Sequence, residues 1–89
     1  MKAVVTVVGK DSMGIIAKVS TACADVGANI EDITQSVLKE YFAMVMVVEI
    51  DKLNVPFTEL VDRLETLGAE NNLEIRTMHE DIFNSMHRV

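Results

Sequence analysis

Residues 3–16 read AVVTVVGKDSMGII, a β-branched run that continues through a glycine-flanked polar loop into an aliphatic pair. The run over 3–8 is apolar on both faces of a pleated strand, which is typical of a strand in the middle of a sheet. Gly9 and Gly14 bracket the polar loop and interrupt the strand pattern. The stretch therefore predicts a central strand, a short loop and a helix.

After the loop, apolar residues recur at spacings of three or four, at Ile16, Val19, Cys23 and Val26. This spacing places them on one face of a helix that we expect to cover about 13–26. Asp11 or Ser12 can cap its start, and Gly27 can end it in a left-handed turn. Cys23 lies on the apolar stripe without a histidine on the same helix, so we interpret it as a buried structural thiol.

The middle of the chain predicts a hairpin. Residues 30–38 are extended and half polar, with their isoleucines out of phase, so we expect an edge strand with a bulge near Asp32. The turn lies at 39–40. Residues 42–48 are apolar on both faces, which again indicates a central strand.

The second half repeats the order of helix and strand. An apolar stripe at helical spacing runs from 57 to 67, and Asn54 and Pro56 mark its start. Residues 73–77 alternate apolar and polar side chains, as an edge strand should. Residues 82–86 form a short amphipathic turn or helix.

This βαββαβ order predicts an α+β, ferredoxin-like sandwich. The strands that are apolar on both faces belong in the middle, which gives an antiparallel sheet of order 4-1-3-2 with both helices on one face. We expect the domain over 1–78 and an amphipathic segment with a short C-terminal helix over 79–89, packing on the domain or on a dimer. The other sheet face would expose Val, Met and Ile, so the C-terminal segment, a second copy, or both must cover it. We therefore expect a homodimer.

Composition excludes several classes of function. A chain of 89 residues is one domain, and its net charge of −6, with singly scattered basic residues, disfavours nucleic-acid binding. The longest uncharged run, 41–48, is too short to span a membrane. One cysteine and no recognisable export signal predict a cytoplasmic location. His79 and His87 lack a third ligand, so we expect no metal site.

Familiar chemical uses of this fold also lack their residues. The first strand has no aromatic side chain to stack on RNA bases, and the first loop has neither a cysteine pair for a soft metal nor an arginine for phosphate. Glu31 and Asp32 lie on an edge strand without an apolar pocket to raise a carboxyl pKa. We therefore expect no enzyme and no cofactor.

Two motifs carry a resemblance to a known family. Residues 9–16 join the first strand to a helix N-terminus, and Gly-Ala-Asn-Ile at 27–30 leads from that helix into the second strand. Both resemble the ACT domain, which places an Asp-x-x-Gly-aliphatic loop and a Gly-x-Asn-Ile turn at these points. Through the whole chain, the resemblance is to small stand-alone ACT proteins and to the ACT half of glycine-cleavage-system repressor-type regulators. Met13 departs from the pattern, because many ACT domains carry Pro there.

The resemblance implies a regulatory module that binds an amino acid between the loop of one subunit and the second-strand start of its partner. Free N–H groups at a helix start can hold a carboxylate, and Asp11 or the Asn29 side-chain oxygen can receive an ammonium group. The predicted ligand-binding residues are Lys10, Asp11, Ser12, Met13, Gly14, Ile15, Asn29 and Ile30.

The same residues also admit purely structural roles. Asp11 and Ser12 can cap a helix, Gly14 can permit close packing, and Asn29 can close a turn without a ligand. The sequence therefore leaves two functions open: a dimeric regulatory module that binds an amino acid, and a ligand-free interaction module that dimerises or docks on a target protein.

Overall fold

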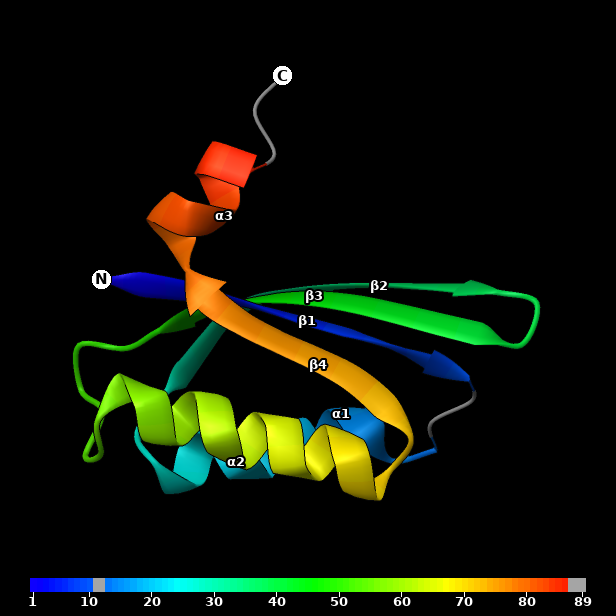
Figure 1. Ribbon diagram of the computed structural model, residues 1–89, viewed down its shortest axis with the longest axis horizontal. Helices are drawn as coiled ribbons and strands as arrows, with labels where there is room; N and C mark the ends of the chain where they lie inside the picture. Colours follow the sequence, from blue (N-terminus) through cyan, green and yellow to red (C-terminus); the bar gives the residue numbers. More distant parts are fainter. Residues whose placement is uncertain (11–12, 87–89) are drawn as a thin grey trace.

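The computed structural model describes residues 1–10 and 13–86 of the chain (Figure 1). The elements are β1 (Lys2–Lys10), α1 (Ile15–Asp25), β2 (Asn29–Leu38), β3 (Tyr41–Glu49), α2 (Phe57–Glu70), β4 (Leu73–His79) and α3 (Glu80–Met86). The four strands form one sheet in the order β2-β3-β1-β4, with every neighbouring pair antiparallel. This is the predicted order, read from the opposite edge of the sheet.

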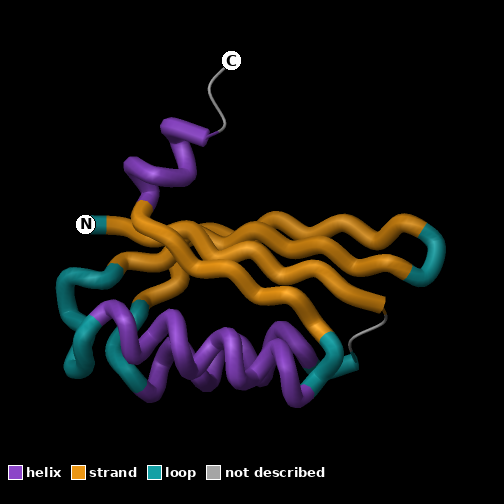
Figure 2. Tube along the Cα trace, in the orientation of Figure 1, coloured by secondary structure: helices purple, strands orange, loops and turns teal. Residues whose placement is uncertain are grey.

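The core lies between the sheet and the two long helices, which cover the same face (Figure 2). Val5 and Val7 of β1 are fully buried there beside their β3 partners, Met46 and Met44. Burying each such side chain contributes about 1.5–3 kcal/mol to folding. Met44 and Met46 of β3 therefore pack in the core, and the expectation that the methionines of this strand line the other sheet face is wrong. Because both faces of β3 are apolar, the sequence did not indicate which residues point to the helices.

The helix that follows β1 begins two residues later than predicted. Gly14 occupies the N-cap position with a φ of 77°, a left-handed conformation that cannot continue into a right-handed helix. The predicted caps Asp11 and Ser12 lie outside the described residues. At the other end, Gly27 has a φ of 82° and confirms the predicted left-handed turn.

The second strand and the second helix agree with their predictions. A register shift between Ile30 and Asp32 confirms the bulge in β2, which is an edge strand. Lys39 adopts a φ of 57° in the hairpin turn. α2 follows Pro56, which is its N-cap, and Asn71 is its C-cap. Within the described ranges, no helix is both long and apolar enough to cross a membrane.

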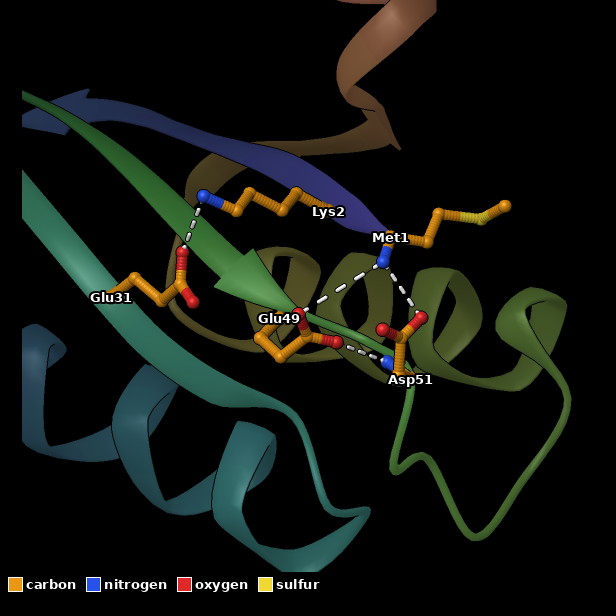
Figure 3. A network of polar contacts seen from close by, with 5 residues as sticks. All are labelled: Met1, Lys2, Glu31, Glu49 and Asp51. Carbon is orange, nitrogen blue, oxygen red and sulfur yellow. Dashed lines mark hydrogen bonds and ion pairs between the residues drawn. The ribbon is translucent and has the colours of Figure 1, made fainter.

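One end of the sheet is held by polar contacts (Figure 3). The Met1 amino group lies 2.7 Å from an Asp51 carboxylate oxygen and 3.9 Å from one of Glu49. The Asp51 backbone N–H donates to Glu49 at 2.5 Å, and Lys2 Nζ lies 2.9 Å from Glu31. These contacts tie β1, β2 and the loop after β3 together at this end.

Candidate functional site

The predicted ligand loop begins where β1 ends. Lys10 is exposed and pairs with Tyr41 in β3, with its Nζ 5.9 Å from the centroid of the Tyr41 ring. Met13 is 90% exposed. The Ile15 side chain, in contrast, is buried in the core and anchors the first turn of α1. The loop therefore presents a fixed helix start beside exposed side chains.

Gly14 is required by its backbone conformation and not by close packing. A Cβ placed on this residue would meet no atom within 4 Å among the described residues. No described residue therefore approaches Gly14 closely enough to require a glycine for packing. As far as the described residues go, the space beside Gly14 is open, and it adjoins backbone N–H groups of α1 that have no partner within the helix. No side chain of the described part of the chain caps them, and the first turn carries no acidic residue.

Asn29 and Ile30 follow the tight turn at the end of α1. The Ala28 N–H donates to the Cys23 carbonyl at 2.9 Å, and the chain then enters β2 at Asn29. The Asn29 side chain is exposed and forms no hydrogen bond with any described residue, so the turn closes through the backbone alone. Ile30 is half-buried and packs against the core.

The structure does not bring Asn29 and the loop together within one chain. Lys10 lies in the row of Tyr41, at one end of the sheet, and Asn29 lies in the row of Glu49 and Lys2, at the other. A strand of nine residues separates these rows by roughly 27 Å. A single site that uses both parts therefore needs a second copy of the chain.

Other residues singled out in the sequence have structural environments. Cys23 is fully buried, and desolvation raises the pKa of its thiol to about 11. The His79 ring stacks on Phe57, with ring centroids 4.2 Å apart. His87 lies outside the described residues, and within them no three potential metal ligands cluster. Glu31 is engaged by Lys2.

A cleft of about 530 Å³ lies at the base of α3 and was not predicted. Its lining residues are Met1, Lys2, His79, Glu80, Asp81 and Ile82. No sequence signal identifies it, because its shape depends on the direction in which α3 leaves the sheet. It lies at the Lys2 end, remote from the Gly14 loop.

Comparisons with known proteins agree with this architecture. The ACT domain family matches residues 2–78. A UPF0237 protein of Methanopyrus kandleri is 44% identical over 88 residues, covering 99% of this chain and 98% of the relative. The structure of an ACT domain protein from Streptococcus pneumoniae superposes with a TM-score of 0.81 at 46% identity, covering 98% of both chains.

A candidate glycine cleavage system transcriptional repressor also superposes, with a TM-score of 0.72 at 26% identity, over 85% of this chain and 43% of that one. These findings confirm the resemblance drawn from the loop and turn motifs. ACT domains are regulatory modules that bind small ligands. With a family match over 2–78 and a close relative along nearly its whole length, the chain belongs to the ACT domain family.

Proposed function

We propose that this chain is a non-catalytic regulatory module that binds an amino acid at a homodimer interface. The observation that carries the proposal is Gly14, the left-handed N-cap of α1: among the described residues no atom lies within 4 Å of the position a Cβ would take there, and no side chain caps the first N–H groups of the helix. A helix start of this kind is suited to a carboxylate, because its N–H groups point outward and the helix dipole favours negative charge.

The ammonium group of the ligand would be received from the second copy. The Asn29 side-chain oxygen is exposed and has no partner among the described residues. A two-fold axis that reverses the strand direction brings the Asn29 end of one sheet level with the Lys10 end of the other. The loop of one chain and the Asn29 turn of its partner would then share one ligand.

Regulation by this module would be exerted on another protein in the cytoplasm. The candidate site offers a helix start, an amide side chain and an exposed lysine, which are groups for recognition and orientation. The buried thiol of Cys23 and the stacked ring of His79 lie away from that loop, in structural positions. The output is therefore a change in assembly or docking when the amino acid binds.

Thermal-shift screening against free amino acids at millimolar concentration tests the proposal, because a ligand that binds only the folded state raises the melting temperature. Isothermal titration of the best ligand then compares Asn29→Ala with the matched control Asn54→Ala, an exposed asparagine at the same end of the sheet. Loss of a charge-assisted hydrogen bond should weaken binding by about 1–3 kcal/mol in Asn29→Ala alone.

Gly14→Asn is the companion variant. Asparagine tolerates a left-handed backbone, so the fold is retained while the new side chain fills the open space. Binding should be lost. Equal affinity in Gly14→Asn, Asn29→Ala and the unmodified chain would place the ligand elsewhere.

The second candidate function is a ligand-free interaction module. It is favoured by the exposed apolar side chains of the sheet face opposite the helices, among them Val8 and Val45. If no amino acid or related metabolite binds at millimolar concentration, this interpretation replaces the first.

A further inference from the structure

The helix layer, which lies below the sheet in Figure 2, carries a groove along α1 and α2, here called the helix groove. It consists of two adjoining hollows of about 380 and 330 Å³, which share Ala22 and Leu67. These two residues are half-buried and pack against the core, so they form an apolar floor. The neighbouring wall residues Ala17, Thr21 and Thr66 are short and exposed. The groove is therefore shallow, apolar at its base and accessible from solvent.

The groove is long enough for about two turns of a helix. α1 follows β1 and α2 follows β3, and because these strands are antiparallel the two helices run in opposite directions. The Lys18 ammonium donates to the Asn71 side-chain oxygen at 2.8 Å, which ties the start of α1 to the end of α2. The lining extends over 17–25 in α1 and 62–70 in α2, or about 12 Å of each helix. Its short side chains let a third helix approach to the usual interaxial distance of roughly 8–10 Å.

Acidic side chains outnumber basic ones along the rim of this groove. Arg63 is neutralised by Glu59, whose carboxylate accepts from the guanidinium at 2.6 Å. The remaining basic group is the ammonium of Lys18. Three exposed acidic residues line the groove and form no hydrogen bond or ion pair with any described residue: Asp25, Asp62 and Glu70. The surplus of negative charge favours a cationic partner.

Two of these carboxylates stand where they do not help the helices that carry them. Asp25 is the last residue of α1 and Glu70 the last of α2, and neither last turn contains a basic residue. The carboxyl end of a helix has a partial negative charge, so an acidic side chain there is repelled. A cation supplied by a partner would offset both the side chain and the helix end. Because the helices are antiparallel, these two points lie at opposite ends of the groove.

We propose that the helix groove binds a basic amphipathic helix of a partner protein. The apolar face of that helix lies on Ala22 and Leu67, and its lysines or arginines reach the acidic rim. Apolar contacts of this kind supply affinity, and the flanking charges set the orientation of the bound helix. The inference names the kind of target on which the proposed regulation would act, and in that respect it rests on the proposed function. Binding of the helix does not itself require an amino acid.

A designed peptide tests the proposal. The probe is a fluorescein-labelled peptide of about 14 residues, built from Leu, Ala and Lys in an order that gives an amphipathic helix. Its matched control has the same composition in an order without an apolar face. In fluorescence anisotropy we expect the probe to bind roughly tenfold more tightly than the control, and more weakly at high salt. Equal affinity of the two peptides, or no binding of the probe at millimolar concentration, would overturn the proposal.

Two matched pairs of variants locate the bound peptide. Asp62→Asn removes a rim charge and should weaken binding roughly threefold, whereas Glu65→Gln, on the flank of α2 beside β4, should leave it unchanged. Ala17→Lys places a cation in the groove and should weaken binding roughly tenfold or more, whereas Ala69→Lys on the β4 flank should not. Equal losses within each pair would show attraction to net charge alone and would refute the groove.

The amino-acid site is measured separately, by titrating the same variants with the ligand found in the thermal-shift screen. We expect Ala17→Lys to lose the peptide and to keep the folded chain's melting temperature within a few degrees of the unmodified one. Peptide binding in a chain that binds no amino acid would refute the ligand site and leave the groove established. Amino-acid binding in a chain that never binds the peptide would refute the groove alone.

Discussion

The two ends of the sheet differ in how completely the chain covers them. At the Lys2 end, Gly27 fits against the loop after β3, ion pairs join neighbouring segments, and α3 shields Val4. At the Lys10 end, no described residue crowds Gly14, and Val8 is half exposed. Glycine and valine thus stabilise the fold at the Lys2 end, whereas at the Lys10 end they remain accessible to a ligand or partner. The available end contains the loop to which we assign ligand binding.

The two left-handed glycines should show the contrast most strongly. A Cβ at Gly27 would lie 2.4 Å from the Lys52 carbonyl oxygen, whereas one at Gly14 would meet nothing within 4 Å in the described structure. Both alanine substitutions strain the backbone by about 1–2 kcal/mol. Gly27→Ala adds a clash with backbone and should cost about 3 kcal/mol or more in total. Urea unfolding measures both, and equal losses would contradict the assignment of crowded and open ends.

The reactivity of a thiol should differ between the buried core, which contains Cys23, and the exposed Lys10 end of the sheet. Burial raises the pKa of Cys23 from its usual 9.0 to about 11, so the folded chain holds a proton that the unfolded chain releases between these values. The stabilisation is complete below pH 9 and is lost as pH rises through 11, by roughly 2–3 kcal/mol relative to Cys23→Ala.

A thiol reagent should leave Cys23 unmodified at pH 8 and modify the monomer of a Val8→Cys variant at once. Rapid modification of Cys23 at pH 8 would show that the core around this thiol opens to solvent.

Truncation of two valines on one face of β1 gives a smaller contrast. Val4→Ala removes two buried methyl groups and should cost about 2 kcal/mol. Val8→Ala should change the stability by less than about 0.5 kcal/mol, because Val8 is 50% exposed. Equal losses in dilute samples would mean that the chain covers both ends by itself.

The ion pair between Lys2 and Glu31 should have the smallest effect. Both side chains are substantially exposed, so solvent and salt screen their attraction. Glu31→Gln should shift the urea midpoint only slightly, and the shift should vanish in high salt. The Glu31 hydrogen bond raises the pKa of Lys2, so any contribution of the pair is present at neutral pH and fades as pH rises above the lysine range. A large, salt-independent loss would show that Glu31 has another role.

Much of the fold could be predicted from the sequence, because strands that are apolar on both faces belong inside a sheet and the helical stripes have one apolar face. Because β3 is apolar on both faces, the sequence could not show which of its side chains face the helices. In the structure, Met44 and Met46 do. The start of α1 depended on the conformation of Gly14, which composition does not reveal.

The candidate site was predictable as a set of motifs but not as an arrangement. The loop and the Asn29 turn are readable from glycine spacing, yet only the strand register shows that they lie at opposite ends of one sheet. The direction of α3, on which the cleft depends, follows from packing after β4 and leaves no local signal in the sequence.

Sedimentation equilibrium of the unmodified chain tests most directly the claim that a second copy is needed to complete the ligand site at the Lys10 end. We predict a mass twice that of the 9.9 kDa chain across the micromolar range. A mass of 9.9 kDa at the highest of these concentrations, with Val8 and Val45 still exposed to solvent, would contradict it.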